Sequence, residues 1–268
     1  MTSREWLLRD DLRSLLTSAE LTVEGRLSGA SNTTLRCEAT TPLGPLRCVV
    51  KPVSGERPLW DFPDWTLSHR ELAAYEVSEA IGWHLVPPTV WREDGPGGEG
   101  MCQLWIDEDR GRSPVRVVPL DTEPEGFLHV LDAEDGYGRP VHLVHATSEP
   151  LLRLAAFDAV VNNADRKGGH VITDDDGRVW GIDHGVTFSA DDKLRTVLWG
   201  WAGESIPAPV LTDLERLDAL LADHYDPVDR WLAEDEREAL RERLGRLLRS
   251  RMFPLPSGRW PAIPWPVF

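Results

Sequence analysis

Two short apolar segments on either side of an Asp-rich turn restrict the fold of this chain more than any other stretch. Residues 171–173 read Val-Ile-Thr and residues 179–182 read Val-Trp-Gly-Ile, with Asp-Asp-Asp-Gly-Arg between them. An Asp-Gly pair between β-favouring segments predicts a β-hairpin, because glycine adopts a positive φ at little cost. A hairpin brings its two ends together, so the residues before 171 and after 182 are expected to meet at one end of the ribbon.

The residues at that end carry a charge or a metal-binding atom. Asp165, Arg166, Lys167 and His170 precede the predicted hairpin, and Asp183 follows it. The glycines that flank this group, which would let a ligand approach the backbone closely, are Gly168, Gly169 and Gly185. Two carboxylates beside a lysine suit metal-assisted chemistry on phosphate groups. The simplest alternative is an Asp-rich hairpin that is only solvated.

The order of these residues resembles that of the protein kinase-like superfamily. Asp165 lies five residues before His170, and residues 183–185 read Asp-His-Gly. In protein kinases a catalytic Asp lies five residues before a metal-binding Asn, and Asp-Phe-Gly supplies a second metal ligand. The chain is most similar to the phosphatidylinositol 3-/4-kinase-like branch, in particular the type II 4-kinases and the HipA-like serine kinases, with their Asp-Arg-x-x-x-Asn loop and Ile-Asp-x-Gly motif. The departure is His170 in place of Asn; an imidazole can ligate a divalent ion, although Mg²⁺ prefers oxygen.

Two upstream segments follow in the order that this resemblance implies. A strand predicted over residues 46–52 contains Lys51, in the position of the lysine that bridges the α- and β-phosphates of ATP. A helix predicted over residues 68–82 carries Glu71, which the resemblance makes the ion-pair partner of Lys51; Glu76 is the alternative partner. Ser68 and Glu71 also have the spacing of a capping box, which would give Glu71 a purely structural role.

Two further segments are expected to contact the nucleotide. A polar turn over residues 28–34, between predicted strands at 23–27 and 35–39, can present N–H groups and hydroxyls to phosphate oxygens. Residues 103–107 fall where the segment between the two kinase lobes should be, and the backbone of residues 104–106 would hydrogen-bond an adenine edge. The nucleotide-binding residues that these two segments imply are Ser31, Asn32, Thr33, Gln103, Leu104, Trp105 and Ile106.

Composition limits the partners and the compartment. The formal net charge of −16 argues against nonspecific nucleic-acid binding and against a basic membrane-docking face. Three cysteines without a Cys-x-x-Cys pair indicate a reducing compartment. The N-terminus lacks an apolar signal core, and no segment approaches the roughly 18 consecutive apolar residues of a membrane-spanning helix. We therefore expect a cytoplasmic protein without stable membrane insertion.

The expected fold is α/β, with the two lobes of a protein kinase-like domain. A small β-rich N-lobe is predicted over residues 1–106 and a larger, mainly helical C-lobe over residues 107–268. Helices are predicted at residues 3–18, from 150 to 161, and at 211–225 and 231–252. Residues 107–145 are polar, contain glycine and proline, and show no clear pattern.

The activity that the resemblance implies is transfer of the γ-phosphoryl group of ATP to a hydroxyl acceptor that the sequence does not identify. Asp165 would orient or deprotonate the acceptor, Lys167 would steady the transferring group, and Asp183 with His170 would hold Mg²⁺ or Mn²⁺. The alternative that His170 motivates is a nucleotide-binding pseudokinase acting as a sensor or scaffold. A metal-dependent hydrolase using Asp165, His170 and Asp183 is a third interpretation, and the oligomeric state is not indicated.

Overall fold

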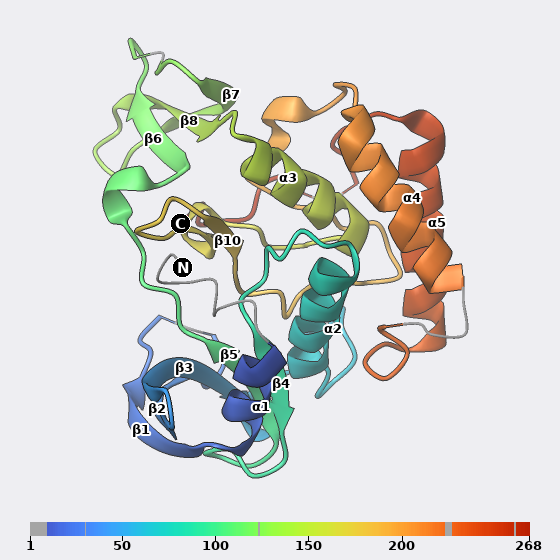
Figure 1. Cartoon of the computed structure of the whole chain (residues 1–268). Helices are drawn as coiled ribbons and strands as arrows, with labels where there is room; N and C mark the ends of the chain where they lie inside the picture. Colours follow the sequence, from blue (N-terminus) through green and yellow to red (C-terminus); the bar gives the residue numbers. More distant parts are fainter. Residues whose placement is uncertain (1–9, 30, 123, 223–226, 260) are drawn as a thin grey trace.

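The structure is a computed structural model that describes residues 10–29, 31–122, 124–222, 227–259 and 261–268 (Figure 1). Its first part is an antiparallel five-stranded sheet in the order β1-β2-β3-β5-β4. The strands are β1 (Glu20–Arg26), β2 (Leu35–Thr41), β3 (Gly44–Pro52), β4 (Thr89–Arg92) and β5 (Gly100–Leu104). The strands predicted in this region are therefore confirmed, with bounds shifted by a few residues.

The helix α1 (Asp10–Ser18) covers one face of this sheet because the strands alternate apolar and polar side chains. Along β3 every second residue is buried. The core between α1 and the sheet contains Leu12, Leu16, Cys37, Ala39, Cys48, Val50, Cys102 and Leu104. Its three cysteines are free thiols. The predicted helix extended to residue 3, and residues 3–9 of it lie outside the described residues.

The helix α2 (Leu67–Ala80) joins the two halves of the molecule. It is buried on most of its circumference, as expected for a helix with packed elements on several sides. Ala73, Tyr75 and Val77 belong to the large core formed with the helices of the second half. In Figure 1, α2 lies between the part at the bottom that contains the five-stranded sheet with α1 and the part above and to the right that contains the later helices.

The N-terminus of α2 differs from the predicted capping box. Ser68 lies within the helix, and its Oγ donates to the carbonyl oxygen of Lys51 at 3.1 Å. The carboxylate of Glu56 instead accepts from the N–H groups of Leu67 at 3.1 Å and Ser68 at 2.8 Å. An acidic residue from the preceding loop thus satisfies the free N–H groups of the first turn.

The second half contains a three-stranded antiparallel sheet that the sequence patterns did not predict. Its order is β6-β8-β7, with β6 (Val115–Pro119), β7 (Phe127–Glu134) and β8 (Pro140–Ala146). The helices that follow are α3 (Glu149–Val161), α4 (Ala208–Ala222) and α5 (Glu234–Ser250), and the short 3-10 turns are η2 (Val53–Gly55), η3 (Arg110–Arg112), η4 (Gly168–His170) and η5 (Trp199–Trp201). Residues 223–226, at the predicted end of α4, lie outside the described residues.

The predicted hairpin is confirmed. β9 (Val171–Thr173) and β10 (Val179–Gly181) pair antiparallel, with Val171 opposite Gly181 and Thr173 opposite Val179. The buried Asp174 shapes the turn, because its carboxylate accepts from the N–H groups of Asp176 and Arg178 and from the indole N–H of Trp180. The residues before β9 and after β10 are therefore held at one end of the ribbon.

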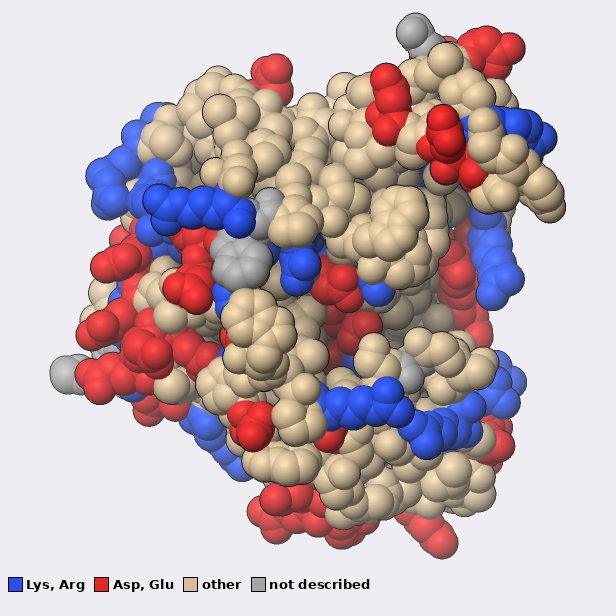
Figure 2. All heavy atoms as spheres, turned by 180° about the vertical axis from the view of Figure 1, so that it is seen from behind, with Lys and Arg blue, Asp and Glu red and all other residues tan. Residues whose placement is uncertain are grey.

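The outer surface carries both signs of charge. Figure 2 shows the side opposite to Figure 1, where basic and acidic side chains are interspersed and a hollow lies between the upper and lower parts. Among the described helices, none has the length and apolar character needed to cross a bilayer.

Candidate active site

Lys51 lies between two carboxylates that come from distant parts of the chain. Its Nζ donates to Glu71 Oε1 at 2.5 Å and to Asp183 Oδ1 at 2.7 Å. Lys51 is on the face of β3 opposite to the α1 core, Glu71 is on α2, and Asp183 follows β10. The alternative partner Glu76 is not near this lysine; it accepts from Arg13 at 2.8 Å.

The charges of these three groups depend on one another. Burial alone would lower the pKa of Lys51, but the carboxylates of Asp183 and Glu71 outweigh it and raise that pKa. Lys51 in turn holds the pKa of Asp183 well below its ordinary value. Burial raises the pKa of Glu71, which Lys51 opposes, and the second oxygen of Glu71 accepts the N–H of His184 at 2.9 Å. The result is an ammonium group with a fixed position, flanked by negative charge.

Asp183 adopts a backbone conformation that is uncommon for a residue with a side chain. Its φ is +59°, in the left-handed region. Such a conformation costs about 1–3 kcal/mol and persists only where the surrounding structure imposes it. Here it turns the carboxylate back toward Lys51, while nearly half of the Asp183 side chain stays exposed.

The loop that carries Asp165 is fixed by the end of α3. The helix ends at Asn162, which has φ +53°. The side chain of Asn163 donates to the buried Asp158 at 3.1 Å and accepts from the N–H of Asp165 at 3.0 Å. Burial raises the pKa of Asp165, and Lys167, whose Nζ lies 3.4 Å from Asp165 Oδ2, opposes that rise.

Arg166 is fully buried and connects the loop to both ends of the hairpin. Its guanidinium donates to the carboxylate of Asp158, to the carbonyl oxygen of His170 at 3.1 Å and to that of Ile182 at 2.8 Å. It also donates to His184 Nε2 at 2.7 Å. Together with backbone hydrogen bonds such as that from Ala164 to Val186, this side chain fixes the Asp165 loop relative to the Asp183 loop, a role that the sequence patterns did not reveal.

His170 faces Asp183 with an unprotonated nitrogen. Its Nδ1 lies 3.0 Å from the carbonyl oxygen of Asp165, which can only accept, so Nδ1 carries the proton. Burial lowers the pKa of His170 to about 4, which leaves Nε2 with a free lone pair at neutral pH. Nε2 lies 3.3 Å from Asp183 Oδ2.

These two electron-rich atoms fit a divalent cation. A neutral imidazole nitrogen opposite a carboxylate oxygen, with the other ring nitrogen bound to a carbonyl oxygen, is the arrangement that metal-ligating histidines have. The nitrogen ligand from His170 favours binding of Mn²⁺ or a later transition metal over Mg²⁺, because Mg²⁺ prefers oxygen ligands.

A pocket of about 270 Å³ opens beside this cluster. Its lining includes most of the residues that the sequence assigned to the nucleotide and to the metal: Ser31, Asn32, Lys51, Gln103, Leu104, Trp105, Ile106, His170 and Asp183. The remaining lining residues, which the sequence analysis did not single out, are the apolar Leu27, Val49, Ile172 and Ile182 and the polar Thr34. Asp165, Lys167, Thr33 and Glu71 do not line it. A mainly apolar pocket with a few charged groups at one end is what a nucleotide site requires.

Three of the residues predicted to contact the nucleotide use their backbone N–H groups within the protein. Thr33 packs against Gly55, whose carbonyl oxygen accepts its N–H at 2.9 Å. The N–H of Leu104 is donated to Pro88 and that of Trp105 to Arg47. The backbone of residues 104–106 was expected to contact adenine, and the N–H groups of two of these three residues are thus already used within the protein.

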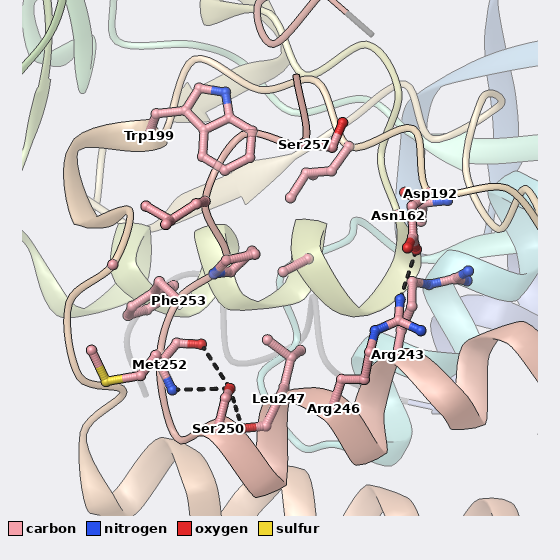
Figure 3. Close-up of a pocket in the computed structure, with 15 residues that line it drawn as sticks. Asn162, Asp192, Trp199, Arg243, Arg246, Leu247, Ser250, Met252, Phe253 and Ser257 are labelled. Carbon is pink, nitrogen blue, oxygen red and sulfur yellow. Dashed lines mark hydrogen bonds and ion pairs between the residues drawn. The ribbon is translucent and has the colours of Figure 1, made fainter. Parts of the chain in front are cut away.

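A larger cavity of about 530 Å³ lies elsewhere, between α5, the end of α3 and the residues after α5 (Figure 3). Trp199, Leu247 and Phe253 give it a largely apolar wall, and the ion pair between Arg246 and Asp192, 2.7 Å long, stands at its edge. It contains none of the carboxylates and lysines described above, so its size does not make it the active-site candidate.

The arrangement of sheets and helices is a protein kinase-like fold of mixed α/β class, and two carboxylates surround Lys51 in it. The structure resembles that of hydra Fam20 with sugar, with a TM-score of 0.55 and 16% identity, covering 89% of this chain and 86% of that one. A second solved structure, the Helicobacter pylori proinflammatory kinase CtkA, has a TM-score of 0.45 at 12% identity, over 89% and 94% of the two chains.

Protein Rv2133c of Mycobacterium tuberculosis (strain ATCC 25618 / H37Rv) is 49% identical over 271 residues, and 97% of each chain is covered. The chain belongs to the same family as that protein. No family model matches the sequence.

Proposed function

We propose that this protein is an ATP-dependent phosphotransferase. The observation that supports it most is the position of Lys51 Nζ, held by Glu71 at 2.5 Å and by Asp183 at 2.7 Å on the wall of an apolar pocket. An ammonium group fixed in this way is suited to binding the phosphates of a nucleotide whose base lies between Leu104 and Ile172. Catalysis by such a site comes from positioning and electrostatic stabilisation rather than from covalent chemistry.

The residues of the two loops have separate roles in this proposal. Asp165 accepts the proton of the acceptor hydroxyl or orients it, and its raised pKa suits a group that takes up a proton. Lys167, beside it, stabilises charge on the transferring group. Asp183 and His170 would hold Mg²⁺ or Mn²⁺, which supplies neutralisation of the phosphate charge. Asn163 and Arg166 position these groups and do not contact the substrates.

The division into lobes is part of the same proposal. The five-stranded sheet lies before Ile106, and α3, α4 and α5 lie after it. We assign residues 1–106 to an N-lobe that binds the nucleotide phosphates and residues 107–268 to a C-lobe that carries the catalytic loop. Placement in the phosphatidylinositol 3-/4-kinase-like branch, near the type II 4-kinases and HipA-like kinases, is supported by the order of the motifs.

The acceptor is a hydroxyl group of a molecule still to be identified. The net charge of −16 disfavours an acceptor embedded in an anionic membrane. Because the Fam20 structure is one with sugar, carbohydrate hydroxyls belong in the acceptor screen together with protein and small-molecule hydroxyls.

The experiment is phosphoryl transfer from labelled ATP, measured with Mg²⁺ and with Mn²⁺ as autophosphorylation, as phosphate release and against a panel of acceptors. Asp165→Asn is expected to lower the rate about 10²- to 10⁴-fold, the range for loss of a general base. The control is Asp176→Asn, an exposed carboxylate in the turn of the hairpin. ATP binding without turnover in the wild type would favour the pseudokinase that His170 suggests, and metal binding without nucleotide binding would favour the hydrolase.

A further inference from the structure

Two histidines and an aspartate gather on the outer face of the β6-β8-β7 sheet, away from the proposed active site. His129 and Asp132 are on β7, and His142 on β8 is the register partner of Asp132. Residues three apart in a regular strand point to opposite faces. A bulge between His129 and Leu131 changes this alternation, so that His129 and Asp132 are both exposed on the same side.

The three side chains meet at one carboxylate oxygen. Asp132 Oδ1 lies 2.7 Å from His129 Nε2 and 2.6 Å from His142 Nδ1. The rings of His129 and His142 meet edge to face at 4.9 Å between centroids. All three candidate ligand atoms lie within 4.8 Å of one another.

The protonation of His142 Nε2 decides which group can lie between His142 Nδ1 and Asp132 Oδ1. His142 Nε2 is 3.1 Å from the carbonyl oxygen of Leu120, which can only accept, so this nitrogen carries a proton. In the neutral ring Nδ1 then has a free lone pair that points at a carboxylate oxygen 2.6 Å away. Two electron-rich atoms this close need a cation between them: a second proton or a metal ion. Metal-ligating histidines commonly donate one ring N–H to a backbone carbonyl in this way, which leaves the other nitrogen free to bind the ion.

We propose that His129 Nε2, His142 Nδ1 and a carboxylate oxygen of Asp132 bind a divalent transition-metal ion of the zinc class. Two imidazoles and one carboxylate suit Zn²⁺, Co²⁺ or Ni²⁺, whereas Mg²⁺ and Ca²⁺ prefer all-oxygen sites. Ligand atoms around a tetrahedral ion with bonds of about 2.0 Å lie about 3.3 Å apart. The exposed Asp132 has room to move outward by the required half ångström or so, and the fourth position faces solvent.

The ion would bind side chains from β7 and β8, and His142 would link it to the carbonyl oxygen of Leu120 in the turn after β6. The opposite face of the same sheet packs on η5, where Gly200 lies against Leu128 and His145. Because the ion binds the folded sheet and not the unfolded chain, it is expected to stabilise the fold, and the stabilisation should grow with the logarithm of the ion concentration above the dissociation constant.

The test is a titration of the full chain, purified without a polyhistidine tag, with Zn²⁺ by calorimetry and with Co²⁺ by visible absorption. Because Mg²⁺ would not keep Zn²⁺ from the nitrogen of His170, every titration is made in a His170→Gln background, in which the site at Asp183 lacks that ligand. In this background the chain is expected to bind one Zn²⁺ and to give a Co²⁺ ligand-field band. His129→Gln, His142→Gln and Asp132→Asn are each expected to weaken Zn²⁺ binding at least tenfold and to abolish that band.

The matched control is His84→Asn, which removes a partly buried histidine paired with a single carboxylate, Glu79, at 2.9 Å. This variant should retain the bound ion. Thermal unfolding without metal should show that all variants are folded, with the largest shift in midpoint for His142→Gln, because His142 is partly buried and contacts the carbonyl oxygen of Leu120. No Zn²⁺ binding by the His170→Gln protein, or binding in that background that survives the loss of both His129 and His142, would overturn the assignment.

Discussion

Two glutamates on α2, five residues apart, differ in what they contact. Glu71 is 1% exposed, and its carboxylate accepts from Lys51 and from the N–H of His184. Glu76 instead pairs with Arg13 of α1. We expect Glu71→Gln to lower ATP turnover at least tenfold, because a charge-assisted hydrogen bond to Lys51 is replaced by a neutral one. Glu76→Gln should leave turnover within about twofold of the wild type. Equal rates for the two variants in a steady-state ATPase or transfer assay would contradict the role given to Glu71.

Arg166 is the residue on which the geometry of the site depends most. It is buried with Asp158, and removing it leaves that carboxylate without its partner. Arg166→Met is therefore expected to reduce the free energy of unfolding by about 3–5 kcal/mol. Arg139→Met removes an exposed pair with Asp135 and should cost less than about 1 kcal/mol. Urea denaturation measures both, and a cost for Arg166→Met as small as that of the surface variant would show that the buried pair does not hold the loops.

The residues of the proposed site differ in how well their type and spacing predicted their surroundings. Lys51, Glu71, His170 and Asp183 meet because each occupies a recognisable position in an ordered series of motifs. The burial of Arg166 could not be predicted, because an arginine after an aspartate is most often a surface residue. The N–H groups of Leu104 and Trp105 are taken by strand partners that are remote in sequence, and no local pattern reports such pairing.

Among the elements, β8 is joined to η5 through a histidine that has to stay neutral. His145 is fully buried; its Nδ1 donates to Ala146 and its Nε2 accepts from the N–H of Gly200 at 3.0 Å. Burial lowers the pKa of His145 in the folded protein below the value of about 6.5 expected in the unfolded chain. The unfolded chain therefore takes up the proton first, and stability that is present above pH 6.5 is lost as the pH falls toward the folded-state pKa.

We accordingly expect the free energy of unfolding to decrease from pH 7.5 to pH 5.5, with a smaller decrease for His145→Gln than for the wild type. Other buried histidines add to the slope in both proteins, so the difference between them isolates His145. Urea denaturation at pH 7.5, 6.5 and 5.5 gives the two slopes. Parallel slopes would contradict the neutral, buried state of this ring.

The hairpin and the three-stranded sheet show why some elements were predicted and one was not. The Asp-Gly turn and its apolar flanks are a local signal, and β9 and β10 followed from it. β6 has one buried residue, β7 has none and β8 has three, and the bulge in β7 breaks the two-residue alternation that identifies a strand. The capping of α2 by Glu56 was also missed, because a side chain from a separate loop replaced the local capping box.

At the scale of the whole molecule, the order of motifs predicted two lobes and a pocket between them. The five-stranded sheet supplies Lys51, α2 supplies Glu71, and the hairpin of the second half supplies Asp183. The pairing of these elements depends on contacts between residues 132 apart, as for Lys51 and Asp183. Such contacts form only when both halves are folded, so nucleotide binding and the packing of α2 are expected to be coupled.

The most direct test of this account is to measure the binding of Mg·ATP by isothermal titration calorimetry and to repeat the measurement with Mn²⁺. We expect one site per chain in the wild type and binding at least tenfold weaker in Lys51→Met, because Lys51 supplies the fixed positive charge for the phosphates. The control is Arg36→Met, which removes an exposed ion pair between Arg36 on β2 and Glu24 on β1 and should bind as the wild type does. Thermal unfolding should show that both variants are folded. Absence of ATP binding by the wild type with either metal, or equal affinity in Lys51→Met, would contradict the proposal that this pocket is a kinase-like nucleotide site.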